Sequence, residues 1–279
     1  MIKDVLVNVS PVSGRDSAVD YAISVAEKFN AHLAGIAIAY ELELPMVMGI
    51  GDMMPPIWIE EQIAKSQEQA RSALNRFEDM ARRAGLSVES RMLTASAASG
   101  SDQFGQLARS FDFSIARQAE QDSQRPVYED LVIEAALFQS GRPLLVVPYV
   151  HKDALRLDRI MICWDGSRHA ARAVADALPL LSNAQDVEIV TVAAQDKTEE
   201  IPGGEIAAHL ARHGMKVAVE RIVAPDEDVA NVILSHAADN STDLLVMGGY
   251  GHSRLREFIL GGATRGILSA MTVPTLMSH

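Results

Sequence analysis

The sequence predicts an α/β protein made of two tandem, doubly wound parallel-sheet domains. Short apolar runs of strand length alternate with longer segments whose apolar residues recur at helical spacing, a pattern typical of a parallel sheet covered by helices on both faces. The length of 279 residues allows two domains of ordinary size. The opening pattern also returns after about 155 residues, which indicates a duplicated domain rather than a solenoid.

The repeat is visible when residues 4–39 are compared with residues 158–194. Each segment begins with an apolar strand, continues through a polar turn into an alanine-rich helix, and ends in a second apolar strand; the strands are Val5–Val9 and Leu33–Ala39 in the first copy, and Ile160–Trp164 and Val187–Ala193 in the second. We therefore expect a first domain over residues 1–150 and a second over residues 157–279.

The ends of the two halves also match, because each closes with a strand–loop–helix–strand unit. Their last strands are predicted at Leu144–Val147 and Thr272–Met277. Tandem copies of one domain often pack as a pseudo-dimer, and we expect these two strands to form the contact edge. Two chains can pair further into a homodimer, and a protein partner of unknown identity can also bind.

The middle of each half has further helical and strand patterns. In the first half, Ile59–Ala84 is the predicted helix and Ser87–Leu93 the next strand; the expected inner face of the helix is formed by Ala64, Ala70, Ala73, Leu74, Phe77 and Met80. In the second half the corresponding elements are a helix over Glu205–His213, a strand over Lys216–Val223 and a helix over Asp228–Asp239, with Asp226 as the expected cap.

The segment Glu41–Trp58 does not fit a regular element, because it contains four methionines, three prolines and two glycines. One interpretation is a surface loop folded onto the sheet or the domain interface. The other is a lid over an apolar ligand, or a docking surface for a partner, since methionine side chains make adaptable contacts.

Composition narrows the functional classes. The net charge of −12 disfavours nucleic acid as the main partner, because phosphate binding relies on clustered lysine and arginine. The single cysteine, Cys163, excludes an in-chain disulfide and a cysteine-based zinc site, and it is expected to be buried in a strand. The histidine spacing predicts no metal site. The chain has no apolar run of membrane-spanning length and no signal peptide, so the cytoplasm is the expected location.

The most informative segment is Leu244–Leu268, in which an apolar strand leads into a run of glycines. Gly248 and Gly251 are expected to turn the backbone with positive φ and to bring it close to a ligand. Gly261 and Gly262 precede a predicted helix over residues 263–270, whose free amides can bind an anion. Together these groups can cradle a polyphosphate, whereas a tight turn with a helix cap is the purely structural alternative.

This glycine pattern resembles the universal stress protein family, whose ATP-binding members carry the motif G-x-x-G-x(9)-G-[ST]. Gly248, Gly251 and Gly261 match its glycines. Gly262 stands where the family has serine or threonine, and Thr264 offers a hydroxyl two residues further on. The family fold is Rossmann-like, of the adenine nucleotide alpha hydrolase-like type. The resemblance covers nearly the whole chain and implies a tandem two-domain member.

The resemblance also implies further ligand contacts in the second half. Asp165 matches the family aspartate that follows the first strand and lies near the adenine and ribose. Val192, close to the end of the second strand, would lie beside the base. From their place in the loop, His252 and Ser253 are candidates to contact a phosphate. The implied cofactor is ATP or a related adenine nucleotide, which a Mg²⁺ ion can accompany.

The first half departs from this pattern. Ser10 replaces the aspartate, and the segment after Ile115 contains no glycine before the next helix. Its acidic residues, which include Glu120 and Glu129, are expected to repel a phosphate. We therefore interpret the first half as structural or regulatory.

Three functions remain open from the sequence. The first is a stress-response or signalling module that binds a nucleotide in the second half and hydrolyses it slowly at most, because no Walker-type lysine or obvious general base is present. The second is an interaction scaffold of the stress response that binds no nucleotide, which the missing Ser/Thr hydroxyl favours. The third is a protein that binds an apolar ligand under the methionine- and proline-rich loop.

Overall fold

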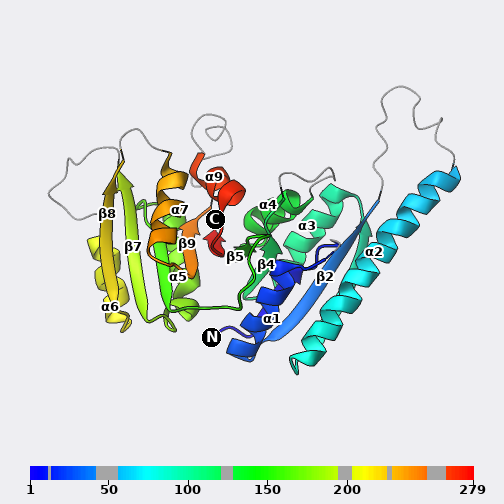
Figure 1. Cartoon of the computed structure of the whole chain (residues 1–279), viewed down its shortest axis with the longest axis horizontal. Helices are drawn as coiled ribbons and strands as arrows, with labels where there is room; N and C mark the ends of the chain where they lie inside the picture. Colours follow the sequence, from blue (N-terminus) through cyan, green and yellow to red (C-terminus); the bar gives the residue numbers. More distant parts are fainter. Residues whose placement is uncertain (12–13, 42–55, 121–127, 194–202, 225–227, 250–261) are drawn as a thin grey trace.

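The computed structural model of the chain describes residues 1–11, 14–41, 56–120, 128–193, 203–224, 228–249 and 262–279. In this part of the chain, ten strands form one sheet in the order β3-β2-β1-β4-β5-β10-β9-β6-β7-β8. Read from its outer edge, each half of the sheet places its own third, second, first, fourth and fifth strands in the same order. Figure 1 shows the first half on the right and the second half on the left. The predicted α/β fold class is confirmed.

The first half alternates strands and helices along the chain. Its elements are β1 (Asp4–Asn8), α1 (Ser17–Phe29), β2 (His32–Tyr40), α2 (Pro56–Arg83), β3 (Val88–Ala95), α3 (Ala97–Ala108), β4 (Phe113–Arg117), α4 (Glu129–Gln139) and β5 (Leu144–Val147). The strands of this half pair in parallel with their neighbours, and Val7 lies opposite Ile115 where β1 meets β4.

The second half repeats this order. Its elements are β6 (Arg159–Cys163), α5 (Arg168–Leu181), β7 (Asp186–Ala193), α6 (Gly204–Arg212), β8 (Val217–Val223), α7 (Val229–Asp239), β9 (Leu244–Gly248), α9 (Gly262–Ala270) and β10 (Thr275–Ser278). Its strands are also parallel, and Ile162 lies opposite Val246 where β6 meets β9.

The two halves join through their last strands, as expected from the sequence. β5 and β10 pair in antiparallel orientation, with Leu144 opposite Met277 and Val146 opposite Thr275. All four of these residues are fully buried. The pairing continues the hydrogen-bonded sheet from one half into the other, so this strand edge is already used within the chain.

Helices cover both faces of the sheet. The side chains of α1, α2, α5 and α6 pack into one hydrophobic core, and those of α3, α4, α7 and α9 pack into a second core on the other face. Successive strand residues point to opposite faces, so Val5 and Val7 enter the first core and Leu6 enters the second. This is why the strands read as continuous apolar runs rather than as alternating ones.

The structure corrects three predictions about elements. Helix α3 was not predicted, because Gly100 and Gly105 lower the helix propensity of its sequence. Ala64 is exposed although it was expected on the inner face of α2, since the core contacts begin only at Ala70. The N-cap of α7 is Asp228, whose carboxylate accepts a hydrogen bond from the Ala230 amide; Asp226 lies outside the described residues.

The segment between the two halves packs against α1. The Leu155 amide donates a hydrogen bond of 2.9 Å to Ser24 Oγ, and the rings of Tyr21 and His151 meet edge to face at 5.5 Å between their centroids. Leu157 is buried at the end of this segment. The connection is therefore part of the packed structure.

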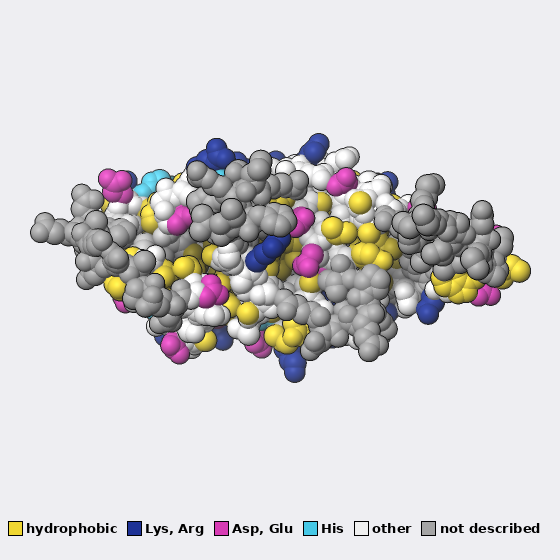
Figure 2. Space-filling model, turned by 90° about the horizontal axis from the view of Figure 1, so that it is seen from above, with side chains coloured by type: hydrophobic (Ala, Val, Ile, Leu, Met, Phe, Trp, Pro, Cys, Tyr) yellow, Lys and Arg dark blue, Asp and Glu magenta, His cyan; other side chains and the backbone are white. Residues whose placement is uncertain are grey.

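The described surface is mixed in character. On the face shown in Figure 2, acidic, basic and hydrophobic side chains of the described residues are interspersed. Among the helices that the structure describes, none has the length and apolar character needed to cross a membrane.

Candidate functional site

The candidate site lies at the carboxyl ends of β6 and β9, which are neighbours in the sheet. The helix after β6, α5, covers one face of the sheet, whereas the helix that follows β9, α9, covers the other. Chain connections that leave neighbouring parallel strands toward opposite faces open a crevice at the carboxyl edge, which is where such folds bind ligands. Both halves of the sheet have this topology.

Asp165 lies in this crevice region, two residues beyond the end of β6. Its side chain is exposed, and Oδ1 accepts a hydrogen bond of 2.9 Å from the Ser167 amide. The turn continues through Gly166 at a φ of 74°, and Ser167 caps α5 by accepting from the Ala170 amide. One carboxylate oxygen thus holds the turn, and within the described chain we see no partner for Oδ2. Asp165 can therefore accept a further hydrogen bond from a ligand.

Gly248 needs to be glycine for a different reason from the one expected. Positive φ was predicted here, but Gly248 is the last residue of β9 and is not among the described residues with positive φ. A Cβ at this position would lie 2.7 Å from the Ala170 amide nitrogen and 2.8 Å from the carbonyl carbon and Cβ of His169. The backbone of the first turn of α5 passes directly over the strand, so only glycine fits.

The amino-terminal end of α9 is open. A helix that connects parallel strands runs back across the sheet, so its amino terminus lies at the carboxyl edge, beside the end of β9. Gly262 is exposed as the first residue of α9, and a Cβ added there would meet nothing within 4 Å. The first turn of α9 contains no acidic residue. The amides of a helix's first turn have no intrahelical partner, so these amides and the helix dipole favour an anion at this end.

The other predicted contact residues divide into two groups. Val192 lies near the end of β7, half-buried against the second core, and Thr264 is buried within α9. Thr264 therefore faces the protein interior, where its hydroxyl is a poor substitute for one at position 262. Gly251, His252, Ser253 and Gly261 lie outside the described residues.

Two groups near the site were not predicted. Arg265 is exposed as the fourth residue of α9. Helix amino termini usually carry acidic residues, because a cation there opposes the helix dipole. The arginine at this position was therefore a sign, readable in the sequence, that this helix end could bind an anion. Behind the end of β9, the His279 ring stacks on His169 at 4.7 Å and its Nδ1 lies 3.1 Å from the Gly249 carbonyl oxygen.

The first half supplies part of the wall behind this site. Phe138 of α4 meets the His279 ring edge to face at 4.7 Å, and a Cβ at Gly249 would be in ordinary contact with Leu137. Gln118, also of the first half, donates a 2.8 Å hydrogen bond from its Nε2 to the Leu268 carbonyl oxygen of α9. The end of β9 is therefore held by both halves of the chain.

Cys163 has no visible role in catalysis. Burial, together with the nearby Asp165 carboxylate, raises the pKa of its thiol to about 12. The thiol therefore stays protonated at neutral pH. Cys163 lies in β6 as predicted, but its residue surface is half-buried against the second core rather than fully buried.

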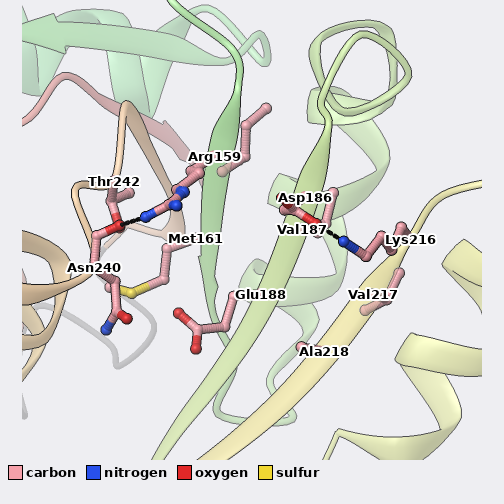
Figure 3. A pocket seen from close by; sticks show the side chains of 11 residues that line it. Arg159, Met161, Asp186, Val187, Glu188, Lys216, Val217, Ala218, Asn240 and Thr242 are labelled. Atoms are coloured by element: carbon pink, nitrogen blue, oxygen red, sulfur yellow. Dashed lines mark hydrogen bonds and ion pairs between the residues drawn. The ribbon is translucent and has the colours of Figure 1, made fainter.

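A cavity of about 400 Å³ lies at the opposite edge of the same half-sheet, where β6, β7 and β8 begin (Figure 3). Asp186 and Lys216 form an ion pair across its rim, and Arg159 donates a 2.8 Å hydrogen bond to the Asn240 carbonyl oxygen. Because the carboxyl ends of the strands face away from it, this cavity is distinct from the candidate site.

Most of the methionine- and proline-rich loop, residues 42–55, lies outside the described residues. Among the residues that the structure does describe, no group of three or more His, Cys, Asp or Glu could hold a metal ion.

Comparison with known proteins finds a family match in the second half of the chain. Residues 156–279 match the model of the universal stress protein family. Universal stress protein Slr1230 of Synechocystis sp. is 31% identical over 142 residues, which are 48% of this chain and 46% of that protein. The chain thus spans about half the length of the curated relative that it matches.

Solved structures with the same fold extend over both halves. A universal stress protein from Archaeoglobus fulgidus DSM 4304 has a TM-score of 0.72 at 14% identity, covering 98% of this chain and 95% of that one. A functionally unknown protein from Pseudomonas aeruginosa PAO1 has a TM-score of 0.61 at 15% identity, covering 99% of this chain and 92% of that one. The tandem arrangement of the sheet is therefore found in other proteins. Residues 156–279 therefore form a domain of the universal stress protein family.

Proposed function

We propose that the second half binds an adenine nucleotide, with ATP as the expected ligand, and that binding serves a stress-response or signalling role. One observation carries the proposal: an exposed carboxylate, Asp165, and an acid-free helix amino terminus, at Gly262, lie at the carboxyl edge of the same half-sheet. A nucleotide needs both features, because its ribose and base offer hydroxyl and amino donors while its phosphates carry negative charge.

In this proposal, each part of the nucleotide would meet a different group of residues. Asp165 Oδ2 would accept a hydrogen bond from the ribose or the base, and Val192 would lie beside the base. The amides at the start of α9 would receive the phosphates, with Gly248, Gly251 and Gly261 allowing close approach of the chain. Arg265, His252 and Ser253 are further candidates to contact the phosphates. A Mg²⁺ ion, if it accompanies ATP, would be held mainly by phosphate oxygens.

Equilibrium dialysis with ATP tests this proposal. Wild-type protein should retain the nucleotide. Asp165→Ala should weaken binding about 10- to 150-fold, as expected for a lost hydrogen bond to a charged group. Asp239→Ala is the matched control, because Asp239 is also an exposed aspartate but lies at the end of α7, toward the opposite edge of the sheet. Absence of binding by wild-type protein, or equal losses in both variants, would remove the proposal.

An interaction scaffold that binds no nucleotide is the second candidate. The observation that favours it is Gly262, which offers no hydroxyl at the motif position even though a side chain there would have room. Mass spectrometry of the supernatant from denatured protein separates the two candidates, because a scaffold would release no nucleotide. If two chains pair, they must use surfaces other than the β5 and β10 edges, which are already joined within the chain.

A further inference from the structure

The first half carries an arginine where the second half has its strand-end glycine. Arg117 ends β4 and lies opposite Val147 of β5, just as Gly248 ends β9 and lies opposite Ser278 of β10. The pairs Val7–Ile115 and Ile162–Val246 fix the same register on the other side of each strand. Arg117 and Gly248 are therefore equivalent positions in the two half-sheets.

A side chain fits at this position in the first half because the following helix starts later. Eight residues separate the end of β1 from the start of α1, whereas four separate the end of β6 from the start of α5. The difference is about one helical turn. In the second half, the first turn of α5 leaves no room for a Cβ at Gly248. In the first half, α1 begins one turn later and leaves room for a side chain, and Arg117 occupies this buried position with 7% of its surface exposed.

The Arg117 guanidinium is surrounded by groups of its own half. Its Nη2 lies 3.2 Å from Glu120 Oε2, its Nη1 lies 4.0 Å from Glu129 Oε1, and its central carbon lies 5.7 Å from the centre of the Tyr149 ring. Glu120 and Glu129, two of the acidic residues that we expected to repel a phosphate, are thus ion-paired with Arg117. Glu129 is also the first residue of α4, so its carboxylate lies at the helix end where α9 has no acidic residue.

Aromatic side chains occupy the neighbouring part of the same edge. Tyr40, at the end of β2, packs against Tyr128, which directly precedes α4, with 4.1 Å between the ring centroids. Val192 of the second half, expected beside the base, lies near the end of the equivalent strand β7. The first half thus places a tyrosine pair beside its carboxylate and guanidinium, at the edge where the second half has exposed groups.

We propose that Arg117, Glu129 and the Tyr40–Tyr128 pair together fill the place of a nucleotide in the first half, with the Arg117 guanidinium at the position that a bound phosphate would take. The chain then binds one nucleotide, in the second half only. The stoichiometry rests on the proposed function, whereas the occupation of the first half by Arg117 does not. Two experiments therefore separate the two claims.

The first experiment measures ATP stoichiometry by isothermal titration calorimetry. Wild-type protein and Arg117→Met should each bind one ATP per chain, because Glu129 and the tyrosine pair still occupy the first half after the substitution. Gly251→Val, placed in the glycine motif of the second half, should bind none. Two ATP per chain in wild type, or one ATP remaining in Gly251→Val, would overturn the inference but leave nucleotide binding intact. No ATP in wild type would instead remove the proposed function.

The second experiment needs no nucleotide. The Arg117 guanidinium lowers the pKa of the Asp16 carboxyl, which burial raises. Carboxyl ¹³C NMR titration should therefore find a higher Asp16 pKa in Arg117→Met than in wild type, and a smaller rise in Arg117→Lys, which keeps a cation without the planar fork. Arg109→Met is the control, since Arg109 is exposed and bonds to the Gln139 carbonyl oxygen. An unchanged Asp16 pKa in both Arg117 variants would show that the guanidinium lies elsewhere and would overturn the inference.

Discussion

Replacing Gly248 with alanine tests the packing at the end of β9. The added Cβ would lie 2.7 Å from the Ala170 amide nitrogen and 2.8 Å from two atoms of His169. Two of these three atoms belong to the backbone of α5, so no side-chain rotation can relieve the contact and the helix must move away from the strand. Overpacking of this kind costs about 1–3 kcal/mol of unfolding free energy.

Gly262→Ala is the matched control for this substitution. Gly262 belongs to the same candidate site, but an added Cβ meets nothing within 4 Å. Its stability should stay the same or rise by up to about 1 kcal/mol, because alanine is a better helix former than glycine.

Urea-induced unfolding followed by circular dichroism measures both variants. Gly248→Ala should unfold at a lower urea concentration with an unchanged m-value, and its thermal midpoint should fall by about 2–4 °C for each kcal/mol lost. A Gly248→Ala protein as stable as wild type would refute the close approach of α5 to β9. Equal destabilisation by both substitutions would refute the distinction drawn between the two glycines.

Three further predictions concern the site and the cores around it. Gly262→Ser restores the hydroxyl at the motif position and should tighten ATP binding about 2- to 10-fold in calorimetry; weaker binding would contradict the open geometry at this helix end. Gly266→Val should lower the unfolding free energy by about 1–3 kcal/mol, because a Cβ there already lies 2.5 Å from Ala230 Cβ, and wild-type stability in urea would count against the tight packing of α7 on α9. Burial raises the Asp16 pKa from 3.8 to about 6, so the folded state binds this proton more tightly than the unfolded state and loses about 2–3 kcal/mol of stability as the pH rises from 4 to above 6. Asp16→Asn keeps an N-cap residue and should remove this part of the stability–pH profile; an identical profile in both proteins would show that Asp16 titrates normally.

The sequence predicted most strands and helices because their apolar residues are consecutive or recur at helical spacing. Residues 33–39 are apolar throughout and fully buried between two helical layers, and in residues 187–193 the apolar Val187, Ile189 and Val190 are buried in the same way. The missed helix α3 shows the limit of this reasoning. A Cβ at Gly105 would lie 2.6 Å from the Ala135 carbonyl oxygen, so the glycine that weakens the helix locally is what lets α3 pack closely on α4.

At the candidate site, the sequence was enough to select the important residues but not to explain why each residue type is needed. The sequence singled out Asp165 and Gly248, and the structure places both residues at the carboxyl edge of neighbouring strands. It could not show that Gly248 is required by the backbone of α5 rather than by a positive φ. The importance of Arg117 also escaped detection, because its equivalence to Gly248 depends on strand register, and a single arginine after a buried strand carries no pattern of its own.

By itself, the sequence determined the α/β class, the duplication and the family of the second half, because each depends on residue types repeated in order along the chain. The tertiary structure alone decided that β5 and β10 pair in antiparallel orientation and so make one continuous sheet of the two halves, and that an arginine in one half and a glycine in the other occupy equivalent places. Those relations depend on distances between residues far apart in the chain, which only the packed fold brings together.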